Sequence, residues 1–481
     1  EGLFDFGLAK HDITAVTEQQ TRTRNILVEN LLTFDRTFGD HKVSALVGYT
    51  YQDSRYRYMQ GSGQGMPTGI TEIDAASQGL AVSGNSSRSV LTSILGRAFY
   101  SYKNRYLLTA TIRRDGSSKF GSNYRYGNFP SVSVGWNIAE EDFVKNSVSW
   151  LDQLKLRGGY GVLGNQEIDN YQYVSVVTTG INYPDGKSGL IQGAFPKTFA
   201  NPDIKWEETA MTNVGIDFMA LRNRLTLTAD WYVKNTKDIL LNVPIPISTG
   251  GANDPIRNAG KIRNQGFEFN LGWNESLNKD LSYGVSFLGT YNKNEVVEMG
   301  AESQVITGGT IHGGTYTSRT LAGYPIGGFW LIPTDGYFNS TEEVQAHQKD
   351  GVLIQPSAEP GDIRFKDTNN DGTINDEDRV YCGSPFPKFT YSINGNITYK
   401  NVDFSIGFQG VTGNKIYNAT KLELTDVTRG TNYLASTLDY WTPENQNASS
   451  PRLIWTDPNR NARSESDRYL ESGSYFRLRN L

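Results

Sequence analysis

The chain has 481 residues, of which 37% are hydrophobic, 12% aromatic and 20% charged, and its formal net charge at pH 7 is −5. This weakly acidic charge gives no reason to expect a nucleic-acid partner. The single cysteine, Cys382, excludes an internal disulfide framework. The mean hydropathy is −0.48 and no run of about 18 apolar residues occurs, so the chain can cross a bilayer only as a closed β-barrel.

Apolar and polar residues alternate along much of the chain, which is the pattern of strands with two different faces. The alternating segments cover 42–51, 105–113, 132–138, 214–218, 225–231, 267–273, 281–291 and 389–409. Counting such windows predicts about thirteen strands, many of them about 10 to 15 residues long. Strands of globular proteins average about 5 to 6 residues, whereas a tilted strand that crosses a bilayer needs about 9 to 11. The strand length therefore favours a membrane barrel.

Tyrosines stand near several expected strand ends, among them Tyr100, Tyr102, Tyr106, Tyr291 and Tyr399. Such positions suit an aromatic girdle at a membrane interface. Aromatic residues favour strands in any sheet, so a single tyrosine does not decide between the two interpretations.

The connections between the expected strands alternate in length. Short turns are expected at 39–41, 103–105, 221–224, 275–280 and 400–401, a middling link at 139–150, and longer connections at 57–88, 115–126, 164–205, 240–261, 296–387 and 418–473. Bacterial outer-membrane barrels have this asymmetry, with short periplasmic turns and long extracellular loops. A sandwich or a propeller does not require it. Residues 296–387 are accordingly expected to form a long extracellular loop region.

One motif in that region carries metal chemistry. Residues 367–378 fit the spacing of a calcium loop, with Asp367, Asn369, Asp371, the Thr373 carbonyl, Asn375 and Asp378 at the ligand positions and Gly372 at the sharp turn. The last position usually carries Glu, and the shorter Asp is expected to bind through one oxygen and to weaken or reshape the site. An Asx-rich turn can also hold itself by side-chain hydrogen bonds. Two alternatives therefore stay open: a structural Ca²⁺ clip and an empty turn.

The clearest hairpin follows this motif. Phe389, Tyr391, Ile393, Gly395, Ile397 and Tyr399 hold one face of the first strand, and Val402, Phe404, Ile406 and Phe408 hold one face of the second. The parity reverses at Lys400-Asn401, and a two-residue turn there places Tyr399 opposite Val402. We therefore predict an antiparallel hairpin with both apolar rows on one surface and small polar residues on the other.

Residue patterns typical of catalysis are missing from the sequence. The four histidines are far apart and form no HExxH pair, no GxSxG elbow occurs, and there is no cysteine pair for zinc. We therefore expect no enzyme and no cofactor other than Ca²⁺. The sequence singles out no catalytic, cofactor-binding or substrate-binding residue.

Several blocks of the sequence resemble one family. The stretch GDIRFKDTNNDGTINDEDR at 361–379, followed by GSPFPKFTY at 383–391, resembles the SusC/RagA family of TonB-dependent outer-membrane transporters of Bacteroidetes. Similar blocks are RDGSSKFG at 114–121, NFPSVSVGW at 128–136, LRGGYG at 156–161, YWTPEN at 440–445 and GSYFRLRNL at 473–481. The blocks follow the order of the family and span most of the chain.

The resemblance implies an all-β fold, a transmembrane antiparallel β-barrel with long extracellular loops. Residues 1–481 would be the barrel domain, part of a plugged barrel of about 22 strands. The N-terminal plug, the TonB box and the closing strands would lie outside these residues. The resemblance also implies active import of oligosaccharides or peptides across the bacterial outer membrane.

The implied partners are a SusD-like surface lipoprotein and the TonB–ExbB–ExbD proteins, which would supply the energy. Loop aromatics such as Tyr316, Tyr324, Trp330 and Tyr337 would either contact substrate or pack inside their loop, and packing is the commoner fate. Two other functions stay open: a passive outer-membrane porin without a plug, and a secreted calcium-binding β protein that acts on carbohydrate.

Overall fold

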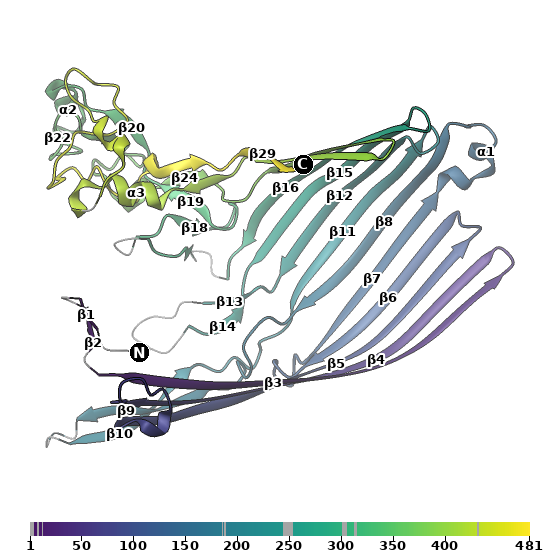
Figure 1. The fold of residues 1–481 in the computed structure, drawn as a ribbon, viewed down its shortest axis with the longest axis horizontal. Coiled ribbons are helices and arrows are strands. Elements are labelled where there is room, and N and C mark those ends of the chain that lie inside the picture. Colours follow the sequence, from purple (N-terminus) through teal and green to yellow (C-terminus); the bar gives the residue numbers. More distant parts are fainter. Residues whose placement is uncertain are drawn as a thin grey trace. The chain divides into compact units, whose positions relative to one another are not determined.

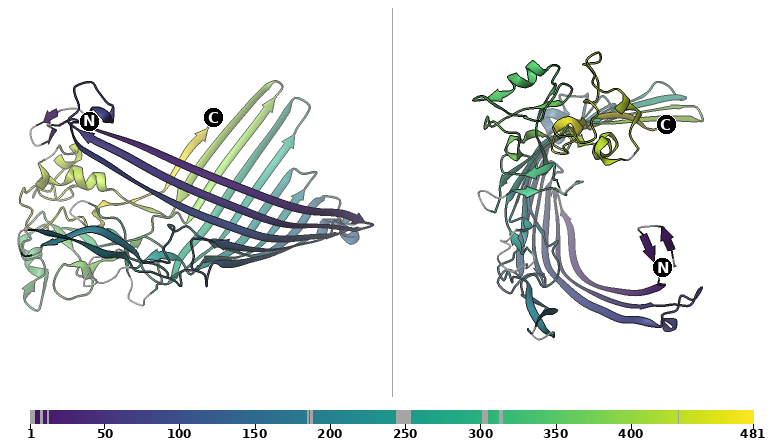
Figure 2. Two further views of the ribbon diagram at one scale, coloured as in Figure 1. Left: turned by 90° about the horizontal axis from the view of Figure 1, so that it is seen from below. Right: turned by 90° about the vertical axis from the view of Figure 1, so that its left-hand side faces the viewer.

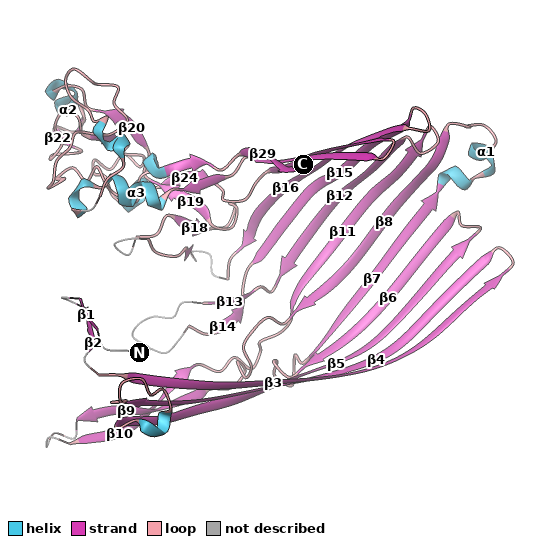
Figure 3. Cartoon of the chain, in the orientation of Figure 1, coloured by secondary structure: helices cyan, strands magenta, loops and turns pink. Residues whose placement is uncertain are grey.

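The structure is a computed structural model that describes residues 4–6, 9–11, 13–184, 186, 189–243, 254–300, 305–311, 315–430 and 432–481. Strands make up most of it (Figures 1 and 3). Among the described residues, thirteen strands are hydrogen-bonded in one sheet in the order β29-β26-β25-β16-β15-β12-β11-β8-β7-β6-β5-β4-β3. Apart from short inserted strands, each strand therefore pairs with its neighbours in sequence. The all-β prediction and the expected number of strands are both confirmed.

The strands of this sheet are long. They are β3 (Ala15–Phe38), β4 (His41–Gln64), β5 (Gln78–Tyr102), β6 (Tyr106–Ser117), β7 (Tyr126–Asn137), β8 (Leu151–Asn165), β11 (Glu207–Ala220), β12 (Leu225–Lys237), β15 (Lys261–Ser276), β16 (Leu281–Glu298), β25 (Phe389–Tyr399), β26 (Val402–Thr412) and β29 (Tyr475–Asn480). Every predicted short turn is confirmed. The residues at 39–40, 103–105, 221–224, 277–280 and 400–401 each join two consecutive strands of the sheet.

Shorter elements fill the long connections. The strands are β1 (Phe4–Phe6), β2 (Ala9–His11), β9 (Val176–Pro184), β10 (Leu190–Thr198), β13 (Leu240–Asn242), β14 (Ile256–Asn258), β17 (Ile306–Thr307), β18 (Ser318–Thr320), β19 (Gly328–Leu331), β20 (Thr334–Tyr337), β21 (Gln348–Lys349), β22 (Val352–Leu353), β23 (Ile363–Phe365), β24 (Val380–Gly383), β27 (Lys415–Tyr417) and β28 (Leu470–Ser472). The helices are α1 (Asp142–Lys145), α2 (Thr341–Ala346) and α3 (Ala419–Thr425), with 3₁₀ turns at Ile73–Ala75, Ile138–Glu140, Asp376–Asp378, Val427–Arg429, Ala435–Leu438 and Asp467–Tyr469. Parts of the predicted long connections, namely 185, 187–188, 244–253, 301–304, 312–314 and 431, lie outside the described residues.

The chain divides into two compact units. Unit 1 comprises Glu1–Trp136, Gly158–Met211 and Thr236–Ala259, and unit 2 comprises Asn137–Arg157, Thr212–Asn235 and Gly260–Leu481.

In unit 1, β3, β4 and β5 run side by side (Figure 2). The β3–β4 register is unbroken from Ala15↔Gln64 to Phe38↔His41, and β4 pairs with β5 as far as Gln64↔Gln78. The long connection predicted at 57–88 is therefore wrong, and the strands are joined instead by residues 65–77. Residues 53–64 alternate little in hydropathy, but backbone hydrogen bonds pair strands whatever the side chains are.

Unit 1 also contains a buried core in which loop residues pack against Phe129 of β7. The cluster consists of Phe120, Phe129, Ile168, Ile204 and Trp206. The Trp206 ring lies 5.1 Å from that of Phe120 and 5.3 Å from that of Phe129, and its Nε1 donates to the Arg125 carbonyl at 3.1 Å. Gly164 is required here because a Cβ at this position would meet the Phe129 ring at 2.1 Å.

In unit 2 the predicted hairpin is confirmed. The strands β25 and β26 pair from Phe389↔Thr412 to Tyr399↔Val402, with the turn at Lys400 and Asn401. The neighbouring strand β16 pairs with β25 without a register shift, from Leu281↔Tyr399 to Tyr291↔Phe389. Apolar rows on adjacent strands therefore coincide.

The long connections of unit 2 carry small cores of their own. In the connection between β16 and β25, Ile332, Ile363 and Phe365 form one buried cluster, and Phe338, Val344 and Ala358 form another. The small sheets β17-β18-β19-β24 and β20-β23 lie in the same connection. These loops are consequently folded structures of their own.

The unit 1 core yields a prediction. Replacing Trp206 by Ala should lower the free energy of unfolding by about 3 to 5 kcal/mol, because it removes a buried ring and leaves a cavity. Urea unfolding of the full-length protein in detergent would measure the loss. Trp150→Ala is the control, since Trp150 is 53% exposed. Equal losses in the two variants would contradict the assignment of Trp206 to a core.

Candidate functional site

One face of the unit 2 sheet is apolar and exposed. Because opposed residues of an antiparallel pair share a face, the apolar row of β25 continues onto β16 and β26. Val285, Phe404 and Val402 on this face are 49%, 48% and 66% exposed. A contiguous exposed apolar surface of this extent is unusual for a protein dissolved in water. We call it the apolar face.

The opposite face of the same strands is lined by small polar side chains. They include Ser392, Asn394, Asn396 and Thr398 on β25 and Asp403, Ser405 and Gln409 on β26. Asn394 Nδ2 donates to Ser286 Oγ at 3.4 Å, and Thr398 Oγ1 donates to Asp403 Oδ1 at 2.7 Å. We call this surface the polar face, and its chemistry suits contact with water.

Unit 2 also contains a cluster of charged side chains from β8, β11 and β12. The Arg157 guanidinium binds Asp217 at 2.8 and 3.0 Å and Asp230 at 2.9 Å through two nitrogens. Gly215 leaves room for it, because a Cβ there would meet Asp230 Oδ1 at 2.3 Å. One cation between two carboxylates leaves a local negative charge. Sequence reasoning missed this cluster because the partners of Arg157 lie 60 and 73 residues away.

In unit 1, β4 presents apolar residues along part of one face. Val43, Ala45, Val47, Tyr49 and Tyr51 form this row, which ends where Asp53 and Arg55 follow on the same face. Tyr102, Tyr106 and Trp136 lie at the short-turn end and stack with ring centroids 6.5 Å apart. The row spans about nine residues, the length that a tilted strand needs to cross a hydrocarbon layer.

The structure brings the six residues of the calcium-like motif into one compact turn. Asp367 accepts hydrogen bonds from the Asp371 and Gly372 N–H groups at 3.1 and 2.8 Å, and Asp371 accepts from the Thr373 N–H at 2.8 Å. The side-chain amide of Asn369 and other donors that bond to Asp371 lower the pKa of this carboxyl to about 2. Gly372 has a φ of +93°, which explains the glycine at this place.

The end of the motif also closes on itself. Asn375 and Asp378 form a capping box around the 3₁₀ turn Asp376–Asp378. The buried Asp378 accepts from the Thr368 and Asn375 N–H groups at 2.7 and 2.8 Å. Within the described part of the chain, no group of three or more His, Cys, Asp or Glu residues is placed to hold a metal ion. Side-chain hydrogen bonds thus account for the shape of the turn, and calcium binding stays a prediction.

A buried ion pair joins the two long connections of unit 2. Arg452 donates to both carboxylate oxygens of Asp362, at 2.7 and 3.0 Å, and Asp362 is completely buried. Asn461 Nδ2 donates to Asp362 at 2.8 Å, and Asn461 Oδ1 accepts from the Ile363 N–H at 2.8 Å. We call Asp362, Arg452 and Asn461 the loop clamp. Sequence reasoning did not find it, because Asp362 lies 90 and 99 residues before Arg452 and Asn461.

Loop aromatics pack against other loop residues. Tyr324 lies 4.8 Å from Trp330 and 5.2 Å from Tyr381, measured between ring centroids. Tyr316 is covered by the guanidinium of Arg379 at 4.8 Å. The interpretation of these aromatics as packing residues therefore fits the structure.

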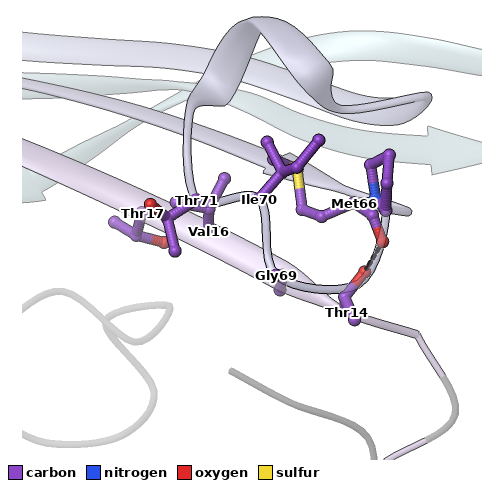
Figure 4. A pocket seen from close by; sticks show the side chains of 9 residues that line it. Thr14, Val16, Thr17, Met66, Gly69, Ile70 and Thr71 are labelled. Carbon is purple, nitrogen blue, oxygen red and sulfur yellow. Dashed lines mark hydrogen bonds between the residues drawn. The ribbon is translucent and has the colours of Figure 1, made fainter.

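The loops also form hollows that could hold small ligands. In unit 1, one of about 580 Å³ lies between the start of β3 and the segment after β4, where Thr14 Oγ1 donates to the Met66 carbonyl at 2.8 Å (Figure 4). Another of about 570 Å³ is lined by Tyr124, Lys205, Asp238 and Arg257 among others. In unit 2, Leu438 and Trp455 line a more apolar hollow of about 490 Å³. Of these three, the hollow lined by Lys205, Asp238 and Arg257 suits a polar ligand best.

None of the helices among the described residues has the length and apolar character required to span a membrane.

Comparison with known proteins gives one family. A family model described as "TonB dependent receptor-like, beta-barrel" matches residues 4–481. "TonB-dependent receptor P3" of Formosa agariphila is 31% identical over 473 residues, covering 97% of this chain and 46% of the relative. "TonB-dependent receptor SusC" of Bacteroides thetaiotaomicron is 33% identical over 340 residues, covering 69% of this chain and 32% of the relative.

Solved structures give the same fold. The chain is similar to a component of the "RagAB peptide transporter", with a TM-score of 0.80 at 22% identity over 97% of this chain and 49% of the other. The "open-open" state of the RagAB peptide importer gives a TM-score of 0.81 at 22% identity over 98% of this chain and 49% of the other. The chain thus spans about half the length of these relatives or less.

The loop clamp yields a prediction. Arg452→Met should destabilise the joined loops by about 3 to 5 kcal/mol, because it leaves the Asp362 charge buried without its partner. Hydrogen–deuterium exchange of peptides covering 355–365 and 450–462 would measure the local opening. Lys421→Met is the control, since the side chains of Lys421 and Glu471 are 36% and 46% exposed and their pair should be worth at most about 1 kcal/mol. If exchange rises equally in both variants, the clamp does not hold the loops.

Proposed function

The chain belongs to the TonB-dependent receptor-like β-barrel family, and we propose that it forms barrel wall and extracellular loops of a transporter that imports oligosaccharides or peptides across a bacterial outer membrane. The transporter would be of the SusC/RagA type. The observation that carries the proposal is the coincidence of apolar rows on β16, β25 and β26 opposite a polar face. Lipid would meet the apolar face and a hydrated interior would meet the polar face.

The alternation of connections supports an orientation. Residues 39–40, 103–105, 221–224, 277–280 and 400–401 would lie at the periplasmic end of the strands. The long connections would then be extracellular, and the region 296–387 with its own cores belongs to them. This end offers the folded surface and the hollows that recognition of a cargo requires.

The proposed cargo and partners are supported by the names of relatives. One relative carries the name SusC, and the solved RagAB structures are those of a peptide transporter or importer. We accordingly propose a SusD-like surface lipoprotein as the partner at the loops and TonB–ExbB–ExbD as the source of energy. Receptors and transporters are the functions that these names give, which supports a role in uptake over an enzymatic one. The exposed apolar face argues against the secreted alternative.

Uptake measurements would test the function. Cells that lack the gene should fail to take up one class of labelled cargo, either oligosaccharides or peptides, and the full-length gene should restore uptake. Collapse of the proton-motive force should abolish the restored uptake if TonB supplies the energy, whereas a passive porin would keep it. Native mass spectrometry of the gently solubilised protein should show a lipoprotein bound to the barrel. Recovery of the barrel alone would remove the partner from the proposal.

The assignment of the faces yields a prediction. Val285→Arg should destabilise the membrane-inserted protein by about 2 to 4 kcal/mol. Val285 lies midway along the apolar row, so an arginine at this position would place a charge near the bilayer midplane. The control is Ser286→Arg, one residue on and on the polar face, which should cost much less. Urea unfolding from lipid vesicles gives both values. The faces would be wrongly assigned if Ser286→Arg were the more damaging change.

We propose calcium as a structural clip at Asp367, Asn369, Asp371, Thr373, Asn375 and Asp378, since their oxygens lie in one turn of the spacing that calcium loops have. Chelation should then raise the hydrogen–deuterium exchange of the peptide covering 367–378. Asp371→Asn should remove this response, while Asp350→Asn should keep it, because Asp350 lies outside the motif and asparagine tolerates its φ of +51°. Exchange that ignores the chelator would leave the empty turn as the correct alternative.

A further inference from the structure

Five arginines gather on one face of unit 1. Arg24, Arg55 and Arg88 are register partners across β3, β4 and β5, and Arg22 is the partner of Arg57 in the next row. Side chains of opposed residues project from the same face of an antiparallel sheet, so the five guanidinium groups share one surface. We call these five residues the arginine patch.

The arginine patch continues the apolar row of β4. Arg55 and Arg57 have the same strand parity as Val47, Tyr49 and Tyr51, and so they lie on the same face of the sheet. On β3 the same holds for Arg22 and Arg24, which follow a row of Ile26, Val28, Leu32 and Phe34 that is interrupted by Asn30. The charges therefore begin where the apolar row ends, on the side of the connection between β4 and β5 and away from the short turns.

One acidic residue organises the arginine patch. Asp53, whose side chain is 5% exposed, binds Arg55 Nη2 at 3.1 Å and Arg88 through Nε at 2.9 Å and Nη2 at 3.0 Å. Five arginines and this aspartate leave four positive charges on the surface. Glu18 has the same parity but lies four residues beyond Arg22.

The remaining charge is available to a ligand. The side chains of Arg55 and Arg88 are each 48% exposed, and Arg22, Arg24 and Arg57 are also exposed. Like charges directly opposite each other on paired strands are destabilising, so an anion bound between the rows would be favourable. Adjacent strands are about 4.8 Å apart and alternate residues about 7 Å apart, which gives an area of about 10 by 7 Å. One or two phosphate groups fit that area.

We propose that the arginine patch binds the phosphate groups of an anionic lipid in the outer leaflet of the membrane. Guanidinium groups recognise phosphate through paired hydrogen bonds, and Asp53 orients two of them beforehand. A lipid fits better than a soluble anion because the apolar row directly adjoins the charges and offers a surface for acyl chains. The inference rests on the proposed location of the barrel in the outer membrane.

Lipid titration of the full-length protein in detergent, followed by native mass spectrometry, tests the proposal. The probes are diphosphoryl lipid A, monophosphoryl lipid A and phosphatidylethanolamine. Diphosphoryl lipid A should bind best and phosphatidylethanolamine weakly. Arg22→Gln with Arg57→Gln should weaken lipid A binding about 30-fold, since each arginine near a lipid surface contributes about 1 kcal/mol, or about 5-fold. This pair leaves the Asp53 ion pairs intact.

The control variant removes two positive charges from the other face of the same strands. Lys42→Gln with Arg97→Gln does this, because Lys42 and Arg97 have the opposite strand parity on β4 and β5. It should bind lipid A like the native protein. Equal weakening in both variants would overturn the proposal, as would unchanged binding in the patch variant.

Two further arms separate the sources of the effect. Inorganic phosphate at millimolar concentration should compete poorly, and full displacement by it would show a simple anion site. Loss of a co-purified acidic protein from the patch variant, with lipid binding unchanged, would also overturn the proposal. Insertion into vesicles is measured separately for the native protein and both variants. If the native protein fails to insert, the membrane location itself is rejected. If it inserts normally but shows no lipid selectivity, only the lipid site is rejected.

Discussion

The structure depends on one constraint, the pairing of backbone hydrogen-bonding groups in a medium that offers no water. Each N–H and C=O group inside a hydrocarbon layer must find a partner within the protein. The registers from Leu281↔Tyr399 to Tyr291↔Phe389 and from Phe389↔Thr412 to Tyr399↔Val402 meet this requirement without a break. Successive side chains point to opposite faces of each strand, so one face can suit lipid and the other water.

Beyond the strands, the same requirement is met by other means. Long connections have no continuous ladder, so their buried polar groups pair with side chains brought from elsewhere. Asp362 receives Arg452 and Asn461, and Gln355 accepts from the Phe365 N–H at 2.8 Å and donates to Asn459 at 2.9 Å. Such networks are stabilising only when every member is satisfied. The loops thus have a defined surface.

Features that depend on local sequence signals could be predicted from the sequence, whereas contacts between distant residues could not. The hairpin at 389–412 and all the short turns were predictable, because alternation and turn residues are local signals. The pairing of residues 57–64 with 78–86 was not, since polar side chains leave no period to detect. Arg157 and Arg452 find their carboxylates 60 to 90 residues away, and a single sequence carries no signal for such distances. The residue spacing at 367–378 was enough to predict a turn. It does not distinguish a turn that binds a metal ion from one held by internal hydrogen bonds.

The boundary between the two environments is itself set by side chains, while the backbone ladder ignores it. On β4 the face that carries Val47, Tyr49 and Tyr51 carries Asp53 and Arg55 next, yet the pairing with β3 and β5 continues without interruption at that point. Beyond the apolar edge water can satisfy backbone groups, so the hydrocarbon layer does not require the pairing that continues there. Continuing the ladder keeps these groups paired and places charged side chains at a fixed height above the apolar row. The strands β3, β4 and β5, with 24, 24 and 25 residues, are thus longer than the roughly 9 to 11 residues that crossing a hydrocarbon layer requires.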